Sequence, residues 1–254
     1  MKVLLTGGSG RLGSELLTLL PTMLDGVGER ITVVSPTSAE LDVTDRGSFE
    51  HAARAADVDV IVHAAAFTDV GGAERQRARC WDVNVVGTRN AASAAAASGA
   101  TLVHVSTDYV FWGDRGGYAE DDVPGPVRNY YALTKLVAEE AARAARSRLI
   151  VRTSFRPREW PYPEAFTDLY TSQDYVDVIA PEVALVVLNA ARVPYEVLHV
   201  ATERKSVYEL ASRRAPAVRP ASKASAPVAL PDDVSLDVTR WLALRAELLA
   251  GGQA

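Results

Sequence analysis

A short apolar run that leads directly into a glycine-rich loop constrains this chain more than any other feature. KVLLT, at residues 2–6, is followed by GGSGRLG. The loop contains G-x-G-x-x-G through Gly8, Gly10 and Gly13, and G-x-x-G-x-x-G when it is counted from Gly7. Glycines at these spacings form a tight turn, let the backbone approach a pyrophosphate and let a helix pack on the strand. Because no G-K-[ST] follows, we predict a dinucleotide-binding loop rather than a Walker loop.

Further strand-like runs recur along the first part of the chain. They are short, apolar or β-branched, and without alternation, at residues 31–35, 59–64, 101–105 and 148–152. Such runs are expected in a parallel sheet that is buried on both faces. The stretches between them have helical spacing, at residues 11–20, 46–55, 73–98 (with a break expected near Arg79) and 128–146. This alternation predicts an α/β fold with a doubly wound, Rossmann-like parallel sheet.

The pattern loosens in the last third of the chain. We predict an NAD(P)-binding domain at 1–155 and a small, partly interleaved substrate-binding lobe at 156–254, with one strand from about 172–200 returning to the first domain. Within the lobe, YVDVI at 175–179 is typical of a strand. The later expected elements are helices at 181–192, 205–214 and 238–249, a strand at 195–201 and a mostly irregular stretch at 215–233. Aromatic residues concentrate between Tyr109 and Tyr175, which suits the rim of a binding cleft.

Composition argues against several classes of protein. The 254 residues are 48% hydrophobic and carry a net charge of −5, and the lack of long basic runs argues against a nucleic-acid partner. No apolar stretch approaches the roughly 20 residues of a membrane span. The amino terminus does not resemble a secretory signal, so we expect a cytoplasmic protein. The single cysteine, Cys80, excludes an internal disulfide, and the four histidines share no metal-ligand spacing, so no metal is predicted.

The end of the second strand bears on the choice of cofactor. NAD-binding domains usually place a carboxylate there to bind the ribose 2′-hydroxyl. Here the strand ends VVSPTS, with Ser35 but no acidic residue. Arg11, within the glycine loop, is placed to face a 2′-phosphate. The sequence therefore favours NADP(H), with NAD(H) as the alternative.

The centre of the chain carries a family resemblance. Its motifs are LDVTD (41–45), HAAAFTDVGGAE (63–74), VNVVGTRN (83–90), VSTDYVFWG (105–113), NYYALTKLVAEE (129–140) and RTSF (152–155). In this order they resemble the extended short-chain dehydrogenase/reductases, and within them the dTDP-4-dehydrorhamnose reductase family. The resemblance implies a nucleotide-sugar substrate and a catalytic triad formed here by Thr107, Tyr131 and Lys135. Members of this class are often dimers through helix faces, so a homodimer is one expected state.

The resemblance and the glycine loop together give a set of expected contact residues. Those expected at the cofactor, besides Tyr131 and Lys135, are Gly7, Gly10, Arg11, Leu12, Gly13, Ser35, Asp42, Val43, Ala64, Ala65 and Ala66. Asp42 and Val43 are expected to flank the adenine. On the substrate side the resemblance implies Asp108, Tyr109 and Phe155.

The triad suits ketone reduction on chemical grounds. Reduction needs a hydride on carbon, which nicotinamide supplies, and a proton on oxygen, which an acid must supply. The pKa of free tyrosine is about 10, and we expect the Lys135 ammonium to lower that of Tyr131. On a helix these two residues lie about 40° apart, whereas Tyr130 faces elsewhere, as packing or as a wall of the substrate site. Thr107 is expected to hydrogen-bond the developing oxyanion.

The type of sugar reaction is less constrained. Dehydratases of this class typically have a glutamate after the Thr-Asp pair, whereas Tyr109 follows Asp108 here. We therefore predict NADP(H)-dependent reduction of the 4-keto group of a nucleotide-linked deoxysugar. A sugar-nucleotide epimerase and a non-catalytic NADP-binding subunit, like the regulatory subunit of methionine adenosyltransferase, stay open as alternatives. Two residues depart from the family pattern: Phe155 replaces the usual tryptophan, and Gln173 replaces an arginine.

Overall fold

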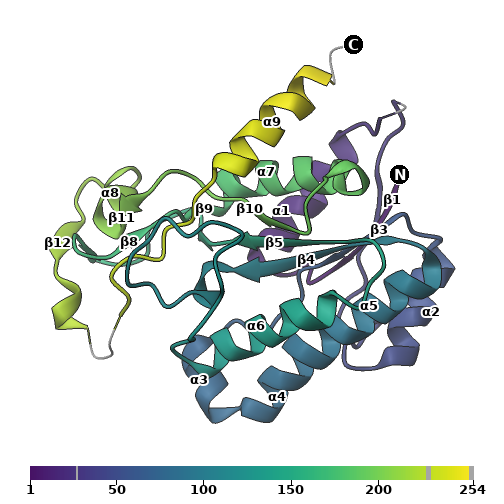
Figure 1. Cartoon of the computed structure of the whole chain (residues 1–254), viewed down its shortest axis with the longest axis horizontal. Helices are drawn as coiled ribbons and strands as arrows, with labels where there is room; N and C mark the ends of the chain where they lie inside the picture. Colours follow the sequence, from purple (N-terminus) through teal and green to yellow (C-terminus); the bar gives the residue numbers. More distant parts are fainter. Residues whose placement is uncertain (27, 227–229, 252–254) are drawn as a thin grey trace.

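A parallel sheet forms the centre of the molecule (Figure 1). The computed structural model describes residues 1–26, 28–226 and 230–251. Within these residues the largest sheet has six strands, in the order β2 (Thr32–Val34), β1 (Lys2–Thr6), β3 (Val60–His63), β4 (Thr101–Thr107), β5 (Arg148–Thr153) and β10 (Val197–His199). All neighbours are parallel, which confirms the predicted fold class. The strand order reverses beside β1, and the carboxyl ends of the strands at such a switch point form a ligand crevice.

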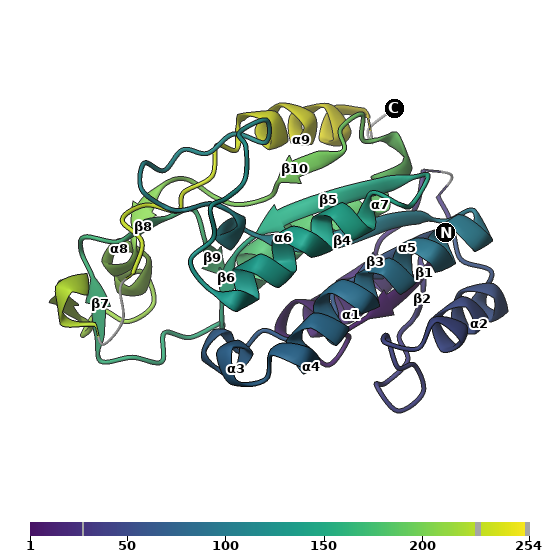
Figure 2. The ribbon, with the colours of Figure 1, turned by 60° about the horizontal axis from the view of Figure 1, so that its bottom comes forward.

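Helices cover both faces of the sheet (Figures 1 and 2). One layer contains α1 (Arg11–Leu19), α7 (Val176–Leu188) and α9 (Thr239–Gly251); the other contains α2 (Arg46–Ala56), α5 (Gly87–Ser98) and α6 (Tyr130–Ala142). Successive residues of one strand enter opposite layers. Val3 and Leu5 pack in the cluster that includes α1 and α7, whereas Leu4 packs in the cluster that includes α2 and α5. Both faces of the strands are therefore apolar, which explains why the sequence shows no alternation.

The long helical stretch after β3 is divided into pieces. They are α3 (Val70–Arg75), α4 (Arg77–Trp81), a π-helical segment η2 (Asp82–Val86) and α5. The first break falls at Gln76 rather than near Arg79. In the π-helical segment the Asn84 side chain accepts a hydrogen bond from Phe67 N at 2.7 Å and donates one to Thr134 Oγ1 at 2.9 Å. Asn84 thus ties the loop after β3 to α6.

A smaller lobe lies beside the carboxyl ends of the sheet (Figure 1). Its described residues include three two-stranded pairs: β6 (Phe155–Arg156) with β9 (Asp174–Tyr175), β7 (Glu164–Phe166) with β12 (Arg219–Ala221), and β8 (Tyr170–Thr171) with β11 (Lys205–Ser206). Together with helix α8 (Val207–Ser212) they enclose a core that includes Leu169 and Val218. The domain boundary at residue 155 stays a prediction, although β10 does return from this region to the sheet.

The segment 175–179 differs from its expected conformation. The strand interpretation is wrong, because only Asp174–Tyr175 is extended and α7 begins at Val176. Ile179 and Val183 are fully buried within the cluster that also holds residues of α1. The β-branched residues here therefore reflect burial, which overrides strand propensity. The helix expected at 181–192 ends at Leu188.

The remaining elements are short. Four 3-10 turns occur in the described residues, η1 (Leu20–Thr22), η3 (Asp108–Val110), η4 (Ala190–Arg192) and η5 (Lys223–Ser225). The stretch 215–233, expected to be mostly irregular, contains β12 and η5, and its residues 227–229 lie outside the described residues.

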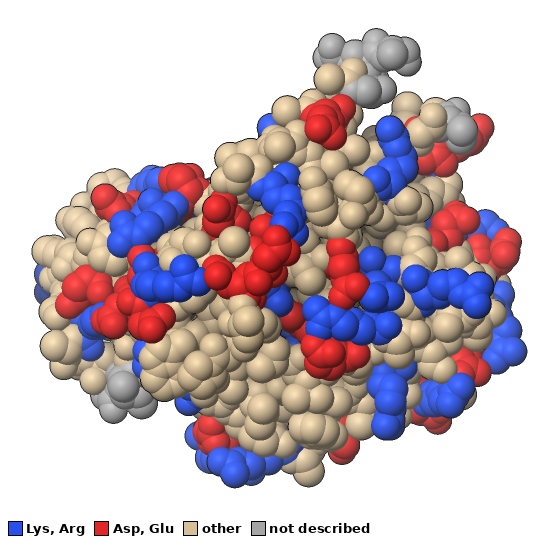
Figure 3. Space-filling view, in the orientation of Figure 1, with Lys and Arg blue, Asp and Glu red and all other residues tan. Residues whose placement is uncertain are grey.

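The surface carries no single dominant charge on the face that Figure 3 presents, where basic and acidic side chains alternate. None of the helices in the described ranges is both long enough and apolar enough to cross a membrane. The described residues also contain no group of three or more His, Cys, Asp or Glu that could hold a metal ion. Cys80 is a buried free thiol.

Candidate active site

A cleft of about 1640 Å³ opens at the switch point of the sheet. Its walls come from the glycine loop, the loops after β2 and β3, the end of β4, the start of α6 and the loop after β5. Every site residue expected from the sequence lines it: Gly7, Gly10, Arg11, Leu12, Gly13, Ser35, Asp42, Val43, Ala64, Ala65, Ala66, Thr107, Asp108, Tyr109, Tyr131, Lys135 and Phe155. The fold therefore brings together residues that are up to 148 positions apart (7 to 155).

The glycine loop is packed too closely for side chains. Gly10 N donates to Gly7 O at 2.9 Å, and Gly7 has a φ of +78°. A Cβ on Gly7 would lie 2.6 Å from Ala65 N, and one on Gly13 would lie 2.1 Å from Gly7 O. In this described region, α1 begins without a side-chain cap and without an acidic residue in its first turn. The positive end of the helix dipole is thus open to the cleft, which fits the pyrophosphate of a dinucleotide.

Local hydrogen bonds fix the cleft wall formed by the end of β2 and residues 42–44. Ser35 Oγ donates to Leu5 O at 2.9 Å. Asp42 Oδ1 accepts from Thr44 Oγ1 at 2.8 Å, and Val43 O accepts from Asn90 Nδ2 at 3.0 Å. These bonds hold the two segments that carry Ser35, expected at the cofactor, and Asp42 and Val43, expected beside the adenine.

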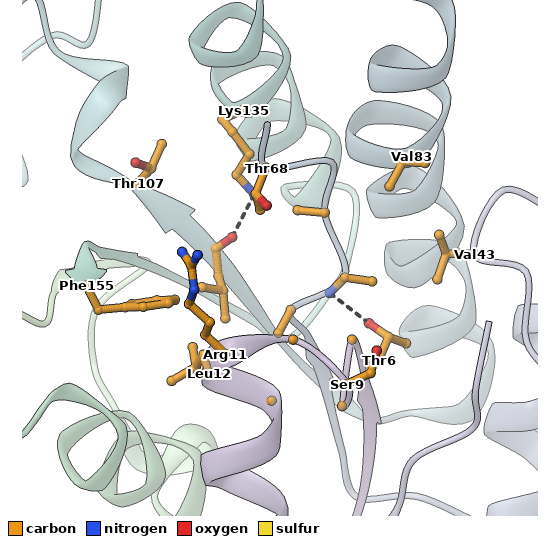
Figure 4. A pocket seen from close by; sticks show the side chains of 18 of the residues that line it. Thr6, Ser9, Arg11, Leu12, Val43, Thr68, Val83, Thr107, Lys135 and Phe155 are labelled. Carbon is orange, nitrogen blue, oxygen red and sulfur yellow. Dashed lines mark hydrogen bonds between the residues drawn. The ribbon is translucent and has the colours of Figure 1, made fainter. Parts of the chain in front are cut away.

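Arg11 points in a direction that the sequence did not indicate. Figure 4 shows its side chain extending into the cleft toward the side where Phe155 lies, while Val43 lies on the other side of the glycine loop. The expected orientation of Arg11 toward a 2′-phosphate beside the adenine is therefore not the one observed. No local pattern fixes the rotamer of an exposed arginine, which explains the difference.

The start of α6 separates the two adjacent tyrosines. Asn129 caps the helix by accepting a hydrogen bond from Ala132 N at 2.8 Å, which fixes the first turn. Tyr131 then lines the cleft. Tyr130 lies outside it, beneath the Arg77 guanidinium at 5.2 Å from its ring centroid, and lines a shallow hollow with Glu74. Tyr130 is therefore a packing residue and not a wall of the main cleft.

Lys135 is buried one turn further along α6. Its Nζ donates to Val105 O at 2.7 Å (Figure 4) and lies 3.4 Å from His104 Nε2. Burial lowers the pKa of Lys135 to about 8, and the Glu139 carboxylate opposes that shift. The His104 ring stacks on His63, and burial, followed by the Lys135 charge, lowers the pKa of both imidazoles. Both histidines are buried core residues, and the sequence gives no sign of the contact between His104 and Lys135.

The pKa of Tyr131 moves in the direction opposite to the expected one. Burial raises it, and the nearby Asp108 charge raises it further. The Lys135 ammonium does not offset these effects, because it is engaged at the carbonyl of Val105 on β4. Tyr131 also makes an edge contact with Tyr109, with ring centroids 6.2 Å apart. The phenol is consequently protonated at neutral pH in this state of the protein.

Asp108 is a buried carboxylate with incomplete hydrogen bonding. Its Oδ1 accepts from Thr107 Oγ1 at 3.0 Å, whereas Oδ2 has no partner among the described residues. Burial raises the pKa of Asp108 to about 6, although hydrogen bonds from Thr107 and Ser154 and the charge of Arg156 oppose the shift. An open acceptor at this point can receive a hydroxyl hydrogen from a bound ligand.

A buried ion pair fixes α6 against the sheet behind the cleft. Glu139 lies one turn after Lys135 and pairs with Arg152 of β5, with 2.8 Å between Oε2 and Nη2. Its Oε1 accepts from Ser106 Oγ at 2.6 Å and from Arg152 Nε at 3.0 Å. Glu139 thereby connects the helix that carries Tyr131 to two strands of the sheet.

Sequence reasoning gave no role to several residues that shape this site. They are Asn84, His104, Glu139 and Arg156. Asn84 and Glu139 stand out in retrospect as polar residues within otherwise apolar helical stretches of recognised motifs. His104 and Arg156 carry no comparable signal, because their importance depends on contacts between distant segments.

Comparison with known proteins agrees with this geometry. Residues 1–233 match the family described as RmlD substrate binding domain. The dTDP-4-dehydrorhamnose reductase of Mycobacterium tuberculosis (strain CDC 1551 / Oshkosh) is 33% identical over 259 residues, which cover 89% of this chain and 81% of that protein. Methionine adenosyltransferase 2 subunit beta of Rattus norvegicus is 34% identical over 141 residues, or 55% of this chain and 42% of the rat protein.

A solved structure extends the likeness to nearly the whole fold. The crystal structure of dTDP-4-dehydrorhamnose reductase from Bacillus anthracis str. Ames, in complex with NADP, matches with a TM-score of 0.80 and 26% identity, covering 99% of this chain and 97% of that one. The match of residues 1–233 and the extent of the mycobacterial relative are sufficient to place the protein. The chain belongs to the RmlD substrate binding domain family.

Proposed function

We propose that this chain is an NADPH-dependent reductase that converts the 4-keto group of a nucleotide-linked deoxysugar to an alcohol, as a dTDP-4-dehydrorhamnose reductase does. The observation that carries the proposal is that a single cleft holds both the glycine loop and the three residues Thr107, Tyr131 and Lys135. The mycobacterial relative is named for this activity, and the Bacillus anthracis relative was crystallised with NADP. The NADP complex of the Bacillus anthracis relative supports NADP(H) over NAD(H) as the cofactor.

The residues divide the chemistry between them. Bound NADPH supplies a hydride to the C4 carbonyl carbon and leaves as NADP⁺. Tyr131 donates its hydroxyl proton to the C4 oxygen, and its raised pKa keeps that proton in place until charge develops on the oxygen. Thr107 donates a hydrogen bond to the same oxygen. Lys135, on the same face of α6, supplies the positive charge that favours the resulting phenolate.

The other contacts are part of the same proposal, which is supported by the position of these residues in the cleft. Gly7, Gly10, Leu12 and Gly13 surround the pyrophosphate, and Ser35, Asp42 and Val43 lie along the adenosine part. Ala64, Ala65 and Ala66 line the centre of the cofactor site. Asp108, Tyr109 and Phe155 face the sugar. A homodimer and a location in the cytoplasm stay predictions.

Epimerisation and a purely regulatory role are less well supported. The reductase relative matches 89% of this chain, whereas the adenosyltransferase subunit matches 55%. No specific feature of the cleft favours an epimerase over a reductase.

The direct test follows NADPH oxidation by the protein with dTDP-4-dehydrorhamnose. Tyr131→Phe should lower kcat by at least about 100-fold, because general acid catalysis contributes 10²–10⁴, while NADPH affinity stays unchanged. Tyr130→Phe is the matched control, since Tyr130 lies outside the cleft. Tight NADPH binding without turnover of any 4-keto sugar nucleotide would favour the regulatory role instead.

A further inference from the structure

Strand β6 places an arginine in the cleft without an anionic partner among the described residues. Arg156 lines the cleft, and its guanidinium makes no hydrogen bond or ion pair within the described residues. Its Nε is buried and has no acceptor there. A guanidinium presents five N–H donors, and burying even one of them without an acceptor is costly. An anion supplied by a ligand would satisfy them.

Arg156 lies at the substrate end of the cleft rather than at the cofactor end. It directly follows Phe155 in β6, and its charge counteracts the effect of burial on the pKa of Asp108 and of Tyr109. In the β6–β9 pair, Phe155 lies opposite Asp174 and Arg156 lies opposite Tyr175. The pairing sets Arg156 next to the segment where Gln173 replaces the arginine of the family pattern.

Aromatic side chains continue the wall beyond Arg156. Its Cζ lies 5.4 Å from the centroid of the Trp160 ring, a cation–π distance. Trp160 contacts Tyr162 edge to face at 5.5 Å, and Tyr162 lines the cleft with 55% of its surface exposed. A charged group beside an exposed aromatic ring suits a nucleotide, because the charged group can bind its phosphates and the ring can pack against its base.

The loop after β6 is held in place from outside the cleft. Arg158, two residues after Arg156, pairs with Glu15 of α1 through two contacts of 2.7 and 2.8 Å. Arg214 donates to the carbonyl of Arg158 at 2.7 Å. These contacts engage neighbouring residues and leave the Arg156 guanidinium free for a ligand.

We propose that Arg156 binds the diphosphate of the nucleotide-linked sugar and that Tyr162, supported by Trp160, packs against its nucleobase. The inference rests on the proposed function and specifies how the substrate is held. In such a sugar the diphosphate is attached at C1, across the ring from the C4 group that faces Tyr131. An anion site beside the catalytic residues, but separate from them, is therefore required. A planar guanidinium can bind phosphate oxygens through two parallel hydrogen bonds.

Titration calorimetry with dTDP, on protein saturated with NADP⁺, tests the proposal. Arg156→Gln should weaken dTDP affinity at least about tenfold, because charge-assisted bonds to phosphate are lost. Arg156→Lys should recover part of the affinity, since it keeps the charge without the planar fork. Tyr162→Ala should weaken the binding of dTDP but leave the binding of inorganic pyrophosphate unchanged. Arg219→Gln is the matched control, because Arg219 forms an exposed ion pair with Glu164 in the same lobe and does not line the cleft; it should change affinity less than about twofold.

Steady-state kinetics separates this inference from the proposed function. Arg156→Gln should raise KM for the keto-sugar nucleotide while kcat changes little, as expected for lost ground-state binding. Equal dTDP affinity in wild type and Arg156→Gln would overturn the inference even if the wild type turns over. Two other results would also overturn it. One is that Arg156→Gln loses affinity for NADP⁺ rather than for dTDP. The other is that the wild type binds neither dTDP nor UDP. Arg156-dependent dTDP binding without turnover would uphold the site and refute the reductase.

Discussion

The hydroxyl of Thr107 donates a hydrogen bond to Asp108 Oδ1 at 3.0 Å, so the two polar groups at the end of β4 are coupled. In the proposed reaction the same hydroxyl must turn to the sugar oxygen. The unpartnered Oδ2 of Asp108 offers a bound sugar hydroxyl an acceptor at the same time. Substrate binding would then exchange the internal bond for two bonds to the ligand.

The buried Asp108 carboxylate should destabilise the ligand-free protein at neutral pH. The pKa of Asp108 is raised from 3.8 to about 6, so its contribution to stability is fully present below about pH 4 and is lost as pH rises through about 6. Asp108→Asn should therefore raise the free energy of unfolding at pH 7 by up to about 3 kcal/mol. Denaturant unfolding at several pH values measures it. A difference between wild type and variant that does not vary between pH 4 and 7 would contradict the assignment.

The charge on Lys135 should control the upper pH limit of cofactor use. Its pKa is lowered to about 8, so the ammonium is present below that pH and is lost as pH rises through it. We expect kcat/KM for NADPH, which reports the free enzyme, to fall above about pH 8 with the slope of one proton. Circular dichroism over the same range serves as the control for unfolding. A profile that stays flat up to the ordinary lysine pKa of about 10.4 would show that the ammonium is not needed.

The Glu139–Arg152 pair should be important for stability because both partners are buried. Glu139→Gln leaves the Arg152 charge without its partner and should cost about 3–5 kcal/mol of unfolding free energy. The exposed Arg46–Glu50 pair on α2 provides the comparison, and Arg46→Gln should cost less than about 1 kcal/mol. Chemical denaturation measures both variants. Similar losses in the two would mean that burial of the Glu139 pair carries no special cost.

Alanine substitutions at Gly7 and Gly99 can separate the effect of a steric clash from that of backbone strain. Gly7 and Gly99 have nearly the same φ, +78° and +77°, but a Cβ meets Ala65 N at 2.6 Å only at Gly7. Gly99→Ala should cost about 1–2 kcal/mol from the left-handed conformation alone, with NADPH affinity unchanged. Gly7→Ala should cost more and should also weaken NADPH. Fluorescence titration with NADPH measures the two affinities. Equal affinities for both variants would count against the proposed pyrophosphate site at the glycine loop.

The sheet and the position of the cleft could largely be predicted from the sequence. Parallel strands that are buried on both faces have a recognisable apolar composition, and each of the first five predicted runs overlaps a strand of the sheet. The glycine loop fixes the cleft, because it must follow the first strand at the switch point. The likeness in the central motifs then placed Tyr131 rather than Tyr130 in that cleft.

Contacts between distant segments account for what could not be predicted. The run at 175–179 is compatible with a strand or a buried helix, and only its packing with α1 decides for the helix. The raised pKa of Tyr131 depends on Asp108 and on the engagement of Lys135 with Val105, which bring β4 and α6 together. Neither relationship is visible in a local pattern.

The late return of β10 has a consequence for how the chain is made. Ile150, Val151 and Arg152 of β5 acquire their outer neighbours only when Val197–His199 arrives, after β6 to β9 and α7 have been made. During synthesis, the apolar edge of β5 therefore stays open until residue 199 has emerged, and an open edge can pair with another chain. Crowded nascent chains would associate at this edge, so the yield of folded protein should depend on how fast residues 153–199, between the ends of β5 and β10, are translated.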